Sequence, residues 1–262
     1  MPKICLTNDD GPYSQGLLKL AEKLAEFSDL TVVVPEGQRS ATGKSLTLNR
    51  PLRVADRGNT NGYKLITHDG TPADSVVLAV SFVKDIDLFV SGINAGANIG
   101  YQSMFTSGTV GAAFEAALKG YPAIAISQEA APADWFNTNG STRNYDAECE
   151  MATGIIKRIL SNGLPPGIDA LNLNYPCDVI ETTPLEITKP ARVRMTNRVI
   201  ARVDPHGRNY YWFEGVETDG KPSDDVNAVM KMDCASLSPI VIESVGDKEV
   251  DLLREFMMKE AS

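Results

Sequence analysis

The sequence predicts an α/β protein built on a mostly parallel sheet that is covered by helices on both faces. Short apolar runs without hydrophobic alternation recur through the first half of the chain, and segments with helical periodicity separate them. Strands that are buried on both faces have such runs, and their alternation with helices is typical of a parallel sheet. At 262 residues, 43% hydrophobic and 23% charged, the chain has the size and composition of a soluble α/β domain with an extension.

The predicted elements follow in order along the chain. Strands are expected at residues 4–6, 30–34, 88–91, 123–127 and 170–174, and helices at residues 16–27, 75–82, 109–118 and 248–259. Residues 181–213 alternate β-branched, aromatic and charged side chains around the turn sequence Asp204-Pro205-His206-Gly207, which predicts a long antiparallel hairpin. Two strands are marginally stable alone, so the hairpin should rest on its own core or on another subunit. The last helix has Val250, Leu253, Phe256 and Met257 on one face, which suits docking within the chain or on another subunit.

Charge and composition exclude several classes of partner. A net charge of −9 argues against a nucleic-acid polymer, because no stripe of Lys and Arg is present to neutralise phosphates. The longest uncharged stretch, residues 88–114, contains five glycines and several polar amides, so we expect no membrane partner. The four cysteines, Cys5, Cys149, Cys177 and Cys234, lie far apart, which favours reduced thiols in the cytoplasm and argues against zinc.

Two adjacent carboxylates, Asp9 and Asp10, follow the first predicted strand and precede Gly11 and Pro12. Neighbouring side chains of a straight strand point to opposite faces, so both can meet one ligand only where the chain turns. A carboxylate pair at the carboxyl end of a strand suits a hard divalent cation, which prefers oxygen ligands. The structural alternative is that the pair forms an Asx turn or caps the following helix.

Other polar residues fall at the same edge of the sheet, where ligands of open α/β sheets bind. Ser40 follows the second strand, and Asn94 and Asn98 lie in the glycine-rich segment after the third. Residues 106–111 open a helix of small residues, and exposed N–H groups beside hydroxyls at a helix start suit a phosphate group. Together these positions predict a site that holds a metal and a phosphate.

A P-loop is disfavoured, although residues 37–45 resemble one. Five residues separate Gly37 from Gly43 where the motif has four, and residues 46–51 do not begin a long helix. The sequence therefore argues against an NTPase in which Lys44 binds a γ-phosphate.

The chain resembles the survival protein SurE family of metal-dependent nucleotidases along nearly its whole length. The matching segments are Thr7-Asn-Asp-Asp-Gly11, Val34-Pro35 with Arg39-Ser40, Gly70-Thr-Pro-Ala-Asp74, Ser91-Gly-Ile-Asn94 with Gly96 and Asn98, Ser107-Gly-Thr-Val-Gly-Ala-Ala113, and Leu171-Asn-Leu-Asn174. The resemblance implies a Rossmann-like core, and a projecting hairpin and C-terminal segment that are exchanged between the subunits of a homodimer or homotetramer. On this basis we divide the chain into a catalytic core (1–180), a hairpin and oligomerisation region (181–235) and a C-terminal strand and helix (236–262).

The resemblance also implies roles for particular residues. The implied metal ligands are Asp9, Asp10, Ser40 and Asn94, and the residues implied to lie against the substrate phosphate are Asn98, Ser107, Gly108 and Thr109. One Mg²⁺ or Mn²⁺ per subunit is expected, since both ions suit an all-oxygen site. Family members often have Arg in place of His206 and Cys in place of Ser75, and Ser238-Pro239-Ile240 replaces a more usual Thr-Pro-Leu. These departures lie outside the implied metal ligands.

The predicted reaction is hydrolysis of nucleoside 5′- and 3′-monophosphates by metal-activated water, with polyphosphate as a further substrate. We expect the catalytic residues to be Asp9, Asp10, Asn98 and Ser107. An aspartyl-phosphate at Asp9 or Asp10 is disfavoured, because a carboxylate committed to a metal is a poorer nucleophile. The alternative function is a non-catalytic, oligomeric nucleotide-binding module that binds without metal dependence.

Four further side chains have alternative roles. His68 and His206 are the only histidines, and surface or turn positions are expected for both rather than catalysis. Tyr101 and Phe105 either stack against a nucleotide base or belong to the core.

Overall fold

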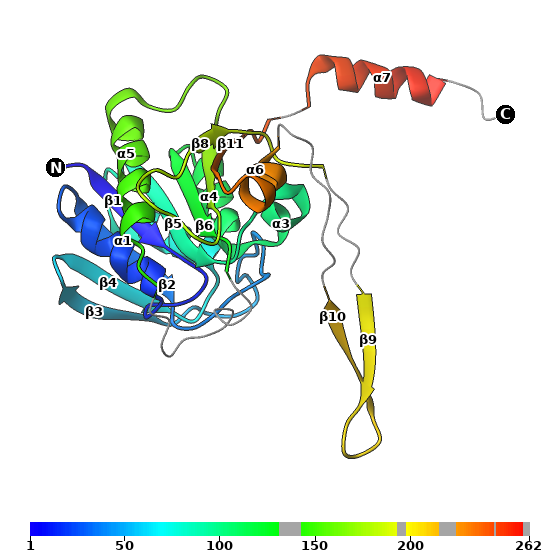
Figure 1. Ribbon diagram of the computed structural model, residues 1–262, viewed down its shortest axis with the longest axis horizontal. Coiled ribbons are helices and arrows are strands. Elements are labelled where there is room, and N and C mark those ends of the chain that lie inside the picture. The colour runs from blue at the N-terminus through cyan, green and yellow to red at the C-terminus, as the bar shows by residue number, and fades with distance from the viewer. Residues whose placement is uncertain (131–142, 193–197, 215–223, 244, 259–262) are drawn as a thin grey trace.

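The computed structural model describes residues 1–130, 143–192, 198–214, 224–243 and 245–258 (Figure 1). Its centre is a nine-stranded sheet with the order β3-β4-β2-β1-β5-β6-β7-β11-β8. The strands are β1 (Lys3–Thr7), β2 (Asp29–Pro35), β3 (Val54–Thr60), β4 (Tyr63–His68), β5 (Leu88–Ala95), β6 (Ala123–Gln128), β7 (Ala170–Tyr175), β8 (Leu185–Ile187) and β11 (Ala235–Ile240). All neighbours in it are parallel except β3 with β4 and β7 with β11, which confirms the predicted fold class.

Helices cover both faces of the sheet. One apolar cluster joins the sheet to α1 (Gln15–Ala25) and α5 (Asp146–Asn162), and a second joins it to α2 (Pro72–Phe82) and α4 (Gly108–Leu118). The short helices α3 (Gly100–Thr106) and α6 (Asp225–Lys231) lie near the end of the sheet where the site is expected (Figure 1). The strands and helices predicted up to residue 174 are all present, and the structure adds β3, β4, α3 and α5, which have no counterpart among the predicted elements. No helix among the described residues has the length and apolarity to cross a membrane.

Local sequence explains where two helices of the core begin. Ser14 caps α1 by accepting a hydrogen bond from the Leu17 N–H at 3.3 Å. Thr71 and Asp74 form a capping box at the start of α2, in which each side chain accepts from the other residue's backbone N–H.

Within the described residues, the predicted long hairpin of residues 181–213 is formed by β9 (Arg198–Val203) and β10 (Asn209–Glu214), and it projects away from the core (Figure 1). Its turn is closed by the Asp204 carboxylate, which accepts from the N–H groups of His206 and Arg208 at 2.8 Å each. The prediction was wrong for the first part of the range, because β8 pairs in parallel with β11 in the central sheet. An alternating pattern does not distinguish a hairpin arm from a strand that extends a sheet.

The predicted C-terminal strand and helix (residues 236–262) also differ in position: the strand joins the central sheet, and the helix lies outside it. Strand β11 pairs antiparallel with β7, so this part of the range belongs to the central sheet. Helix α7 (Asp247–Met258) confirms the last predicted helix; all its side chains are exposed, and it extends away from the sheet (Figure 1).

Candidate active site

The turn after β1 is held by Asn8, which is fully buried. Its Oδ1 accepts from the Gly11 N–H at 3.1 Å and its Nδ2 donates to the Gly11 carbonyl at 2.9 Å. Gly11 has a φ of +94°, and a Cβ there would lie 3.3 Å from Gly37 Cα, so only glycine suits this close approach of two loops. Asn8 makes the turn and Ser14 caps α1. The alternative in which Asp9 and Asp10 serve as turn or cap is therefore wrong.

Asp9 is buried and held by the start of α4. Its Oδ1 accepts from the Thr109 hydroxyl at 2.5 Å, and the backbone N–H groups of Gly108 and Thr109 also hydrogen-bond to the carboxylate. Burial raises the pKa of Asp9, and these hydrogen bonds partly oppose that effect. The helix start predicted to bind a phosphate therefore orients a carboxylate, and the Thr109 hydroxyl is directed at Asp9.

Asp10 follows Asp9 directly and is partly buried. Burial and the negative charge of Asp9 raise the pKa of Asp10 to about 7, and its Oδ2 accepts a long hydrogen bond of 3.4 Å from the Ala95 N–H. In the described part of the chain, neither carboxylate forms an ion pair with Lys or Arg. Two adjacent carboxyl groups without a cationic partner form a site that a bound cation would stabilise.

The remaining implied metal ligands lie next to this pair. The Nδ2 of Asn94 donates to the Gly96 carbonyl at 2.6 Å, which fixes the amide and leaves Oδ1 as the atom for a ligand. Ser40 is exposed on the loop after β2, and the neighbouring Arg39 N–H donates to the Asp9 carbonyl at 2.6 Å. The described residues contain no cluster of three acidic, His or Cys side chains, so a cation here would complete its shell with neutral oxygens.

The implied phosphate contacts surround the same edge. Ser107 caps α4, since its Oγ accepts from the Val110 N–H at 3.1 Å. A Cβ on Gly108 would lie 2.9 Å from Asp9 Cβ and 3.0 Å from Thr42 Oγ1, so glycine is needed at this position. Asn98 is four residues beyond Asn94, and its Nδ2 donates to Ser127 Oγ at 2.8 Å.

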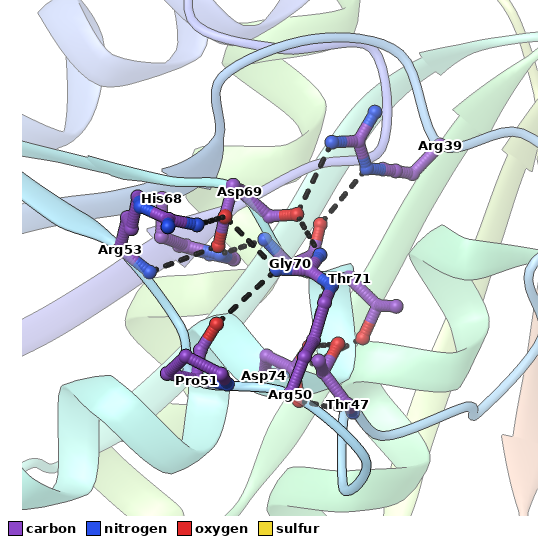
Figure 2. Close-up of polar contacts among 10 residues, drawn as sticks. All are labelled: Arg39, Thr47, Arg50, Pro51, Arg53, His68, Asp69, Gly70, Thr71 and Asp74. Carbon is purple, nitrogen blue, oxygen red and sulfur yellow. Dashed lines mark hydrogen bonds and ion pairs between the residues drawn. The ribbon is translucent and has the colours of Figure 1, made fainter.

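An arginine and two aspartates outside the predicted site hold the loop that carries Ser40 (Figure 2). The Arg39 guanidinium donates to the carbonyls of Gly70 at 3.0 Å and Asp69 at 3.3 Å. The Asp74 carboxylate accepts from the N–H and hydroxyl of Thr47, and Asp69 pairs with Arg50 and Arg53. In the sequence, Arg39 and the segment Gly70–Asp74 stand out only as matches to the family. Their shared role, which is to hold the loop that carries Ser40, depends on contacts between residues about thirty positions apart in sequence.

The two histidines lie outside this site. His206 is exposed in the hairpin turn, as expected. The expectation of a surface position was wrong for His68, which is 1% exposed. Its Nδ1 accepts from the Gly70 N–H at 3.0 Å and its Nε2 lies 2.7 Å from Ser75 Oγ, so it supports the loop that binds Arg39. Burial lowers the pKa of His68 to about 4, which makes it neutral at physiological pH.

Two other sequence alternatives can be compared with the structure. Lys44 pairs with the buried Glu115 at 2.5 Å, so its ammonium group is held by a carboxylate. Tyr101 and Phe105 are 45% and 65% exposed, so the core interpretation is wrong for both. Their rings stack with centroids 6.2 Å apart, and Phe105 stacks in turn on Phe114 at 6.1 Å.

Comparisons with known proteins identify the family and support the overall fold. The family model described as survival protein SurE matches residues 4–201. A 5′-nucleotidase SurE of Methanothrix thermoacetophila is 40% identical, with 94% of this chain and 95% of the relative covered. A 5′-nucleotidase SurE of Thermococcus gammatolerans is 38% identical, with 99% and 97% covered. The crystal structure of a SurE protein from Aquifex aeolicus matches with a TM-score of 0.79 and 29% identity, covering 98% of this chain and all of that one.

Proposed function

The chain belongs to the SurE family, and from this premise we propose that it is a metal-dependent hydrolase that releases phosphate from nucleoside monophosphates. The observation that carries the proposal is the Asp9–Asp10 pair at the carboxyl end of β1, in which Asp9 is buried, Asp10 is partly buried and both have raised pKa values. Such perturbed carboxyl groups are frequent at functional sites.

The donor set fits a hard divalent cation. Asp9, Asp10, Ser40 and the fixed Oδ1 of Asn94 would hold one Mg²⁺ or Mn²⁺, and all of these donors are oxygens. When bound, the ion would polarise a phosphoryl oxygen and lower the pKa of a bound water.

The chain's own groups would bind and orient the substrate. The Asn98 Nδ2 donates one N–H to Ser127, and its second N–H would donate to a phosphoryl oxygen. Ser107 accepts from the Val110 N–H, so its own hydroxyl hydrogen can be donated to the phosphate. Because the net charge is −9, recognition of an anionic substrate depends on such local donors.

Water is the proposed nucleophile. Asp9 is fixed by the Thr109 hydroxyl and by the backbone at the start of α4, so its carboxylate has little freedom to approach phosphorus. Trapping of a labelled acyl-phosphate on denatured enzyme would contradict this step and support an aspartyl-phosphate intermediate.

The first experiment measures phosphate released from nucleoside 5′- and 3′-monophosphates and from polyphosphate, with Mg²⁺ or Mn²⁺. We expect EDTA and Asp10→Asn to abolish release, whereas Asp85→Asn, which changes an exposed carboxylate on a distant turn, should leave it unchanged. Nucleotide binding without metal dependence and without phosphate release would contradict the proposal and favour a non-catalytic binding module.

The exposed stack of Tyr101 and Phe105 is proposed to bind the nucleotide base. Stacking on an aromatic ring contributes about 0.5–1.5 kcal/mol beyond area burial, so Phe105→Ala should raise KM for a nucleotide about 2- to 10-fold. KM for glycerol 2-phosphate, a phosphomonoester without any aromatic group, serves as the control. Equal changes for both substrates would rule out base stacking at this position.

A homodimer or homotetramer that exchanges C-terminal segments is also proposed. The supporting observation is the exposure of large apolar side chains on the projecting elements: Tyr211, Trp212 and Phe213 on β10, and Leu253, Phe256, Met257 and Met258 on α7. Exposed apolar surface of this extent marks interaction sites. Light scattering should give a multiple of 28.3 kDa, reduced on deletion of residues 246–262. A monomeric mass for the full chain would refute the proposal.

A further inference from the structure

The segment Leu171-Asn-Leu-Asn174 on β7 has no role in the chemistry proposed above. Its two asparagines are both fully buried, and they alternate with leucines, so their amides lie on the same face of the sheet. Both amides reach the backbone of Asn98. Asn174 Oδ1 accepts from the Asn98 N–H at 2.7 Å, and Asn172 Nδ2 donates to the Asn98 carbonyl at 2.9 Å.

The orientation of both amides follows from their partners. An N–H requires an acceptor and a carbonyl requires a donor, so Asn174 must present oxygen and Asn172 must present nitrogen. The other halves, Asn174 Nδ2 and Asn172 Oδ1, are buried without a hydrogen-bond partner among the described residues. A buried polar atom without a partner is unfavourable. The favourable contribution of these two side chains is therefore their hydrogen bonds to the Asn98 backbone.

The rest of the loop between β5 and α3 is held as firmly. The Gly96 N–H donates to the Gln128 carbonyl at 2.7 Å, and the Gly100 N–H donates to Asp225 Oδ2 at 2.8 Å. Ser127, which accepts from the Asn98 side chain, pairs in register with Asn94 on one side and with Asn174 on the other. These hydrogen bonds fix the position of the loop relative to strands β6 and β7.

We propose that Asn172 and Asn174 are positioning residues of this site. They hold the backbone of Asn98 from both sides, so that the second N–H of its side-chain amide is directed at the substrate phosphate. This inference rests on the proposed phosphomonoesterase function. Both side chains are fully buried and act through their hydrogen bonds to the Asn98 backbone.

The test compares two substitutions at one position. Asn174→Asp keeps an oxygen that can accept from the Asn98 N–H, and the nitrogen that it replaces has no partner among the residues described. Because the position is fully buried, the new carboxyl group should stay protonated, so the variant introduces no buried charge. Asn174→Leu keeps the approximate size but removes the acceptor. For Asn174→Leu we expect kcat/KM for a nucleoside monophosphate to fall about 10²-fold, since small misplacements of catalytic groups have effects of this size. Asn174→Asp should remain close to wild type, and Asn172→Leu should repeat the loss.

A second readout does not depend on turnover. Exchange of the Asn98 backbone amide hydrogen, followed by NMR, should accelerate in Asn174→Leu and stay slow in Asn174→Asp. Thr153→Val is the matched control, because it removes a buried hydroxyl without a hydrogen-bond partner among the described residues, on α5 across the sheet from the site. It should change neither kcat/KM nor the exchange rate.

The outcomes separate the two proposals. No phosphate release by the wild-type protein with either metal would refute the proposed function, and the positioning role with it. An active wild type with unchanged kcat/KM in both Leu variants, or with Asn174→Asp as impaired as Asn174→Leu, would overturn the positioning role alone. If Asn174→Leu does not fold, Asn172→Leu and Asn174→Asp provide the same comparison.

Discussion

Acidification should destabilise the protein through His68, which the fold keeps neutral. Its Nδ1 accepts from the Gly70 N–H at 3.0 Å, so the Nε2 hydrogen is directed at Ser75 Oγ. A second proton on Nδ1 would place two donors against each other in a buried environment. The cost of burying a charge is the main reason why the pKa falls from 6.5 to about 4; Arg39 adds to this effect, and Asp74 and Asp69 oppose it.

The size of the effect follows from the thermodynamic linkage between proton binding and folding. Between pH 6.5 and pH 4 the unfolded chain binds a proton on this histidine that the folded chain does not, so stability is lost as pH falls through this window. The full loss is about 3 kcal/mol, and about 1.4 kcal/mol of it should be reached between pH 7.5 and pH 5.5. The range stays above the isoelectric point near 4.8, where solubility is lowest.

Urea unfolding at several pH values can measure this term. Wild type should lose about 1.4 kcal/mol more than His68→Asn between pH 7.5 and 5.5, because asparagine does not titrate. The carboxyl groups of Asp9, Asp10 and Asp225 have raised pKa values and act in the opposite direction, but they are common to both proteins. Parallel slopes for the two proteins would refute the assignment of a neutral, buried His68.

Three further substitutions probe the loops of the site. Asp74→Asn removes a carboxylate that accepts from Thr47 and Thr71, so urea unfolding should show a loss of about 1–3 kcal/mol; unchanged stability would contradict the importance of this contact. Gly108→Ala should lower kcat/KM at least 10-fold, because the new Cβ would contact Asp9. Its control, Gly154→Ala on an exposed face of α5, should leave kcat/KM unchanged and stabilise the fold by about 0.5–1 kcal/mol. Equal effects of the two substitutions on kcat/KM would refute the steric argument. His206→Ala, in the exposed hairpin turn, should leave turnover unchanged, and a loss as large as that of Asp10→Asn would assign this histidine to catalysis.

The sequence was sufficient for the parallel core and for one edge of the site. Continuous apolar runs such as residues 30–34 and 123–127 indicate strands buried on both faces, and their helical connections require parallel pairing. The carboxyl ends of such strands lie together, so strand order and chain direction are enough to place Asp9, Asp10 and Asn94 at one edge. These inferences succeed because periodicity and chain direction are local properties.

Tertiary structure alone decided which polar groups hold the site together. The role of Asn8 in the turn and the clamp of Arg39 on Gly70 depend on partners that no local pattern specifies. The two asparagines of β7 reach Asn98 across more than seventy residues of sequence. Likewise, residues 185–187 have a hairpin-like pattern but join the edge of β11, because that edge offers unpaired backbone groups. Hydrogen-bond partners distant in sequence are chosen by the packed fold, which brings a donor and an acceptor together where water is excluded.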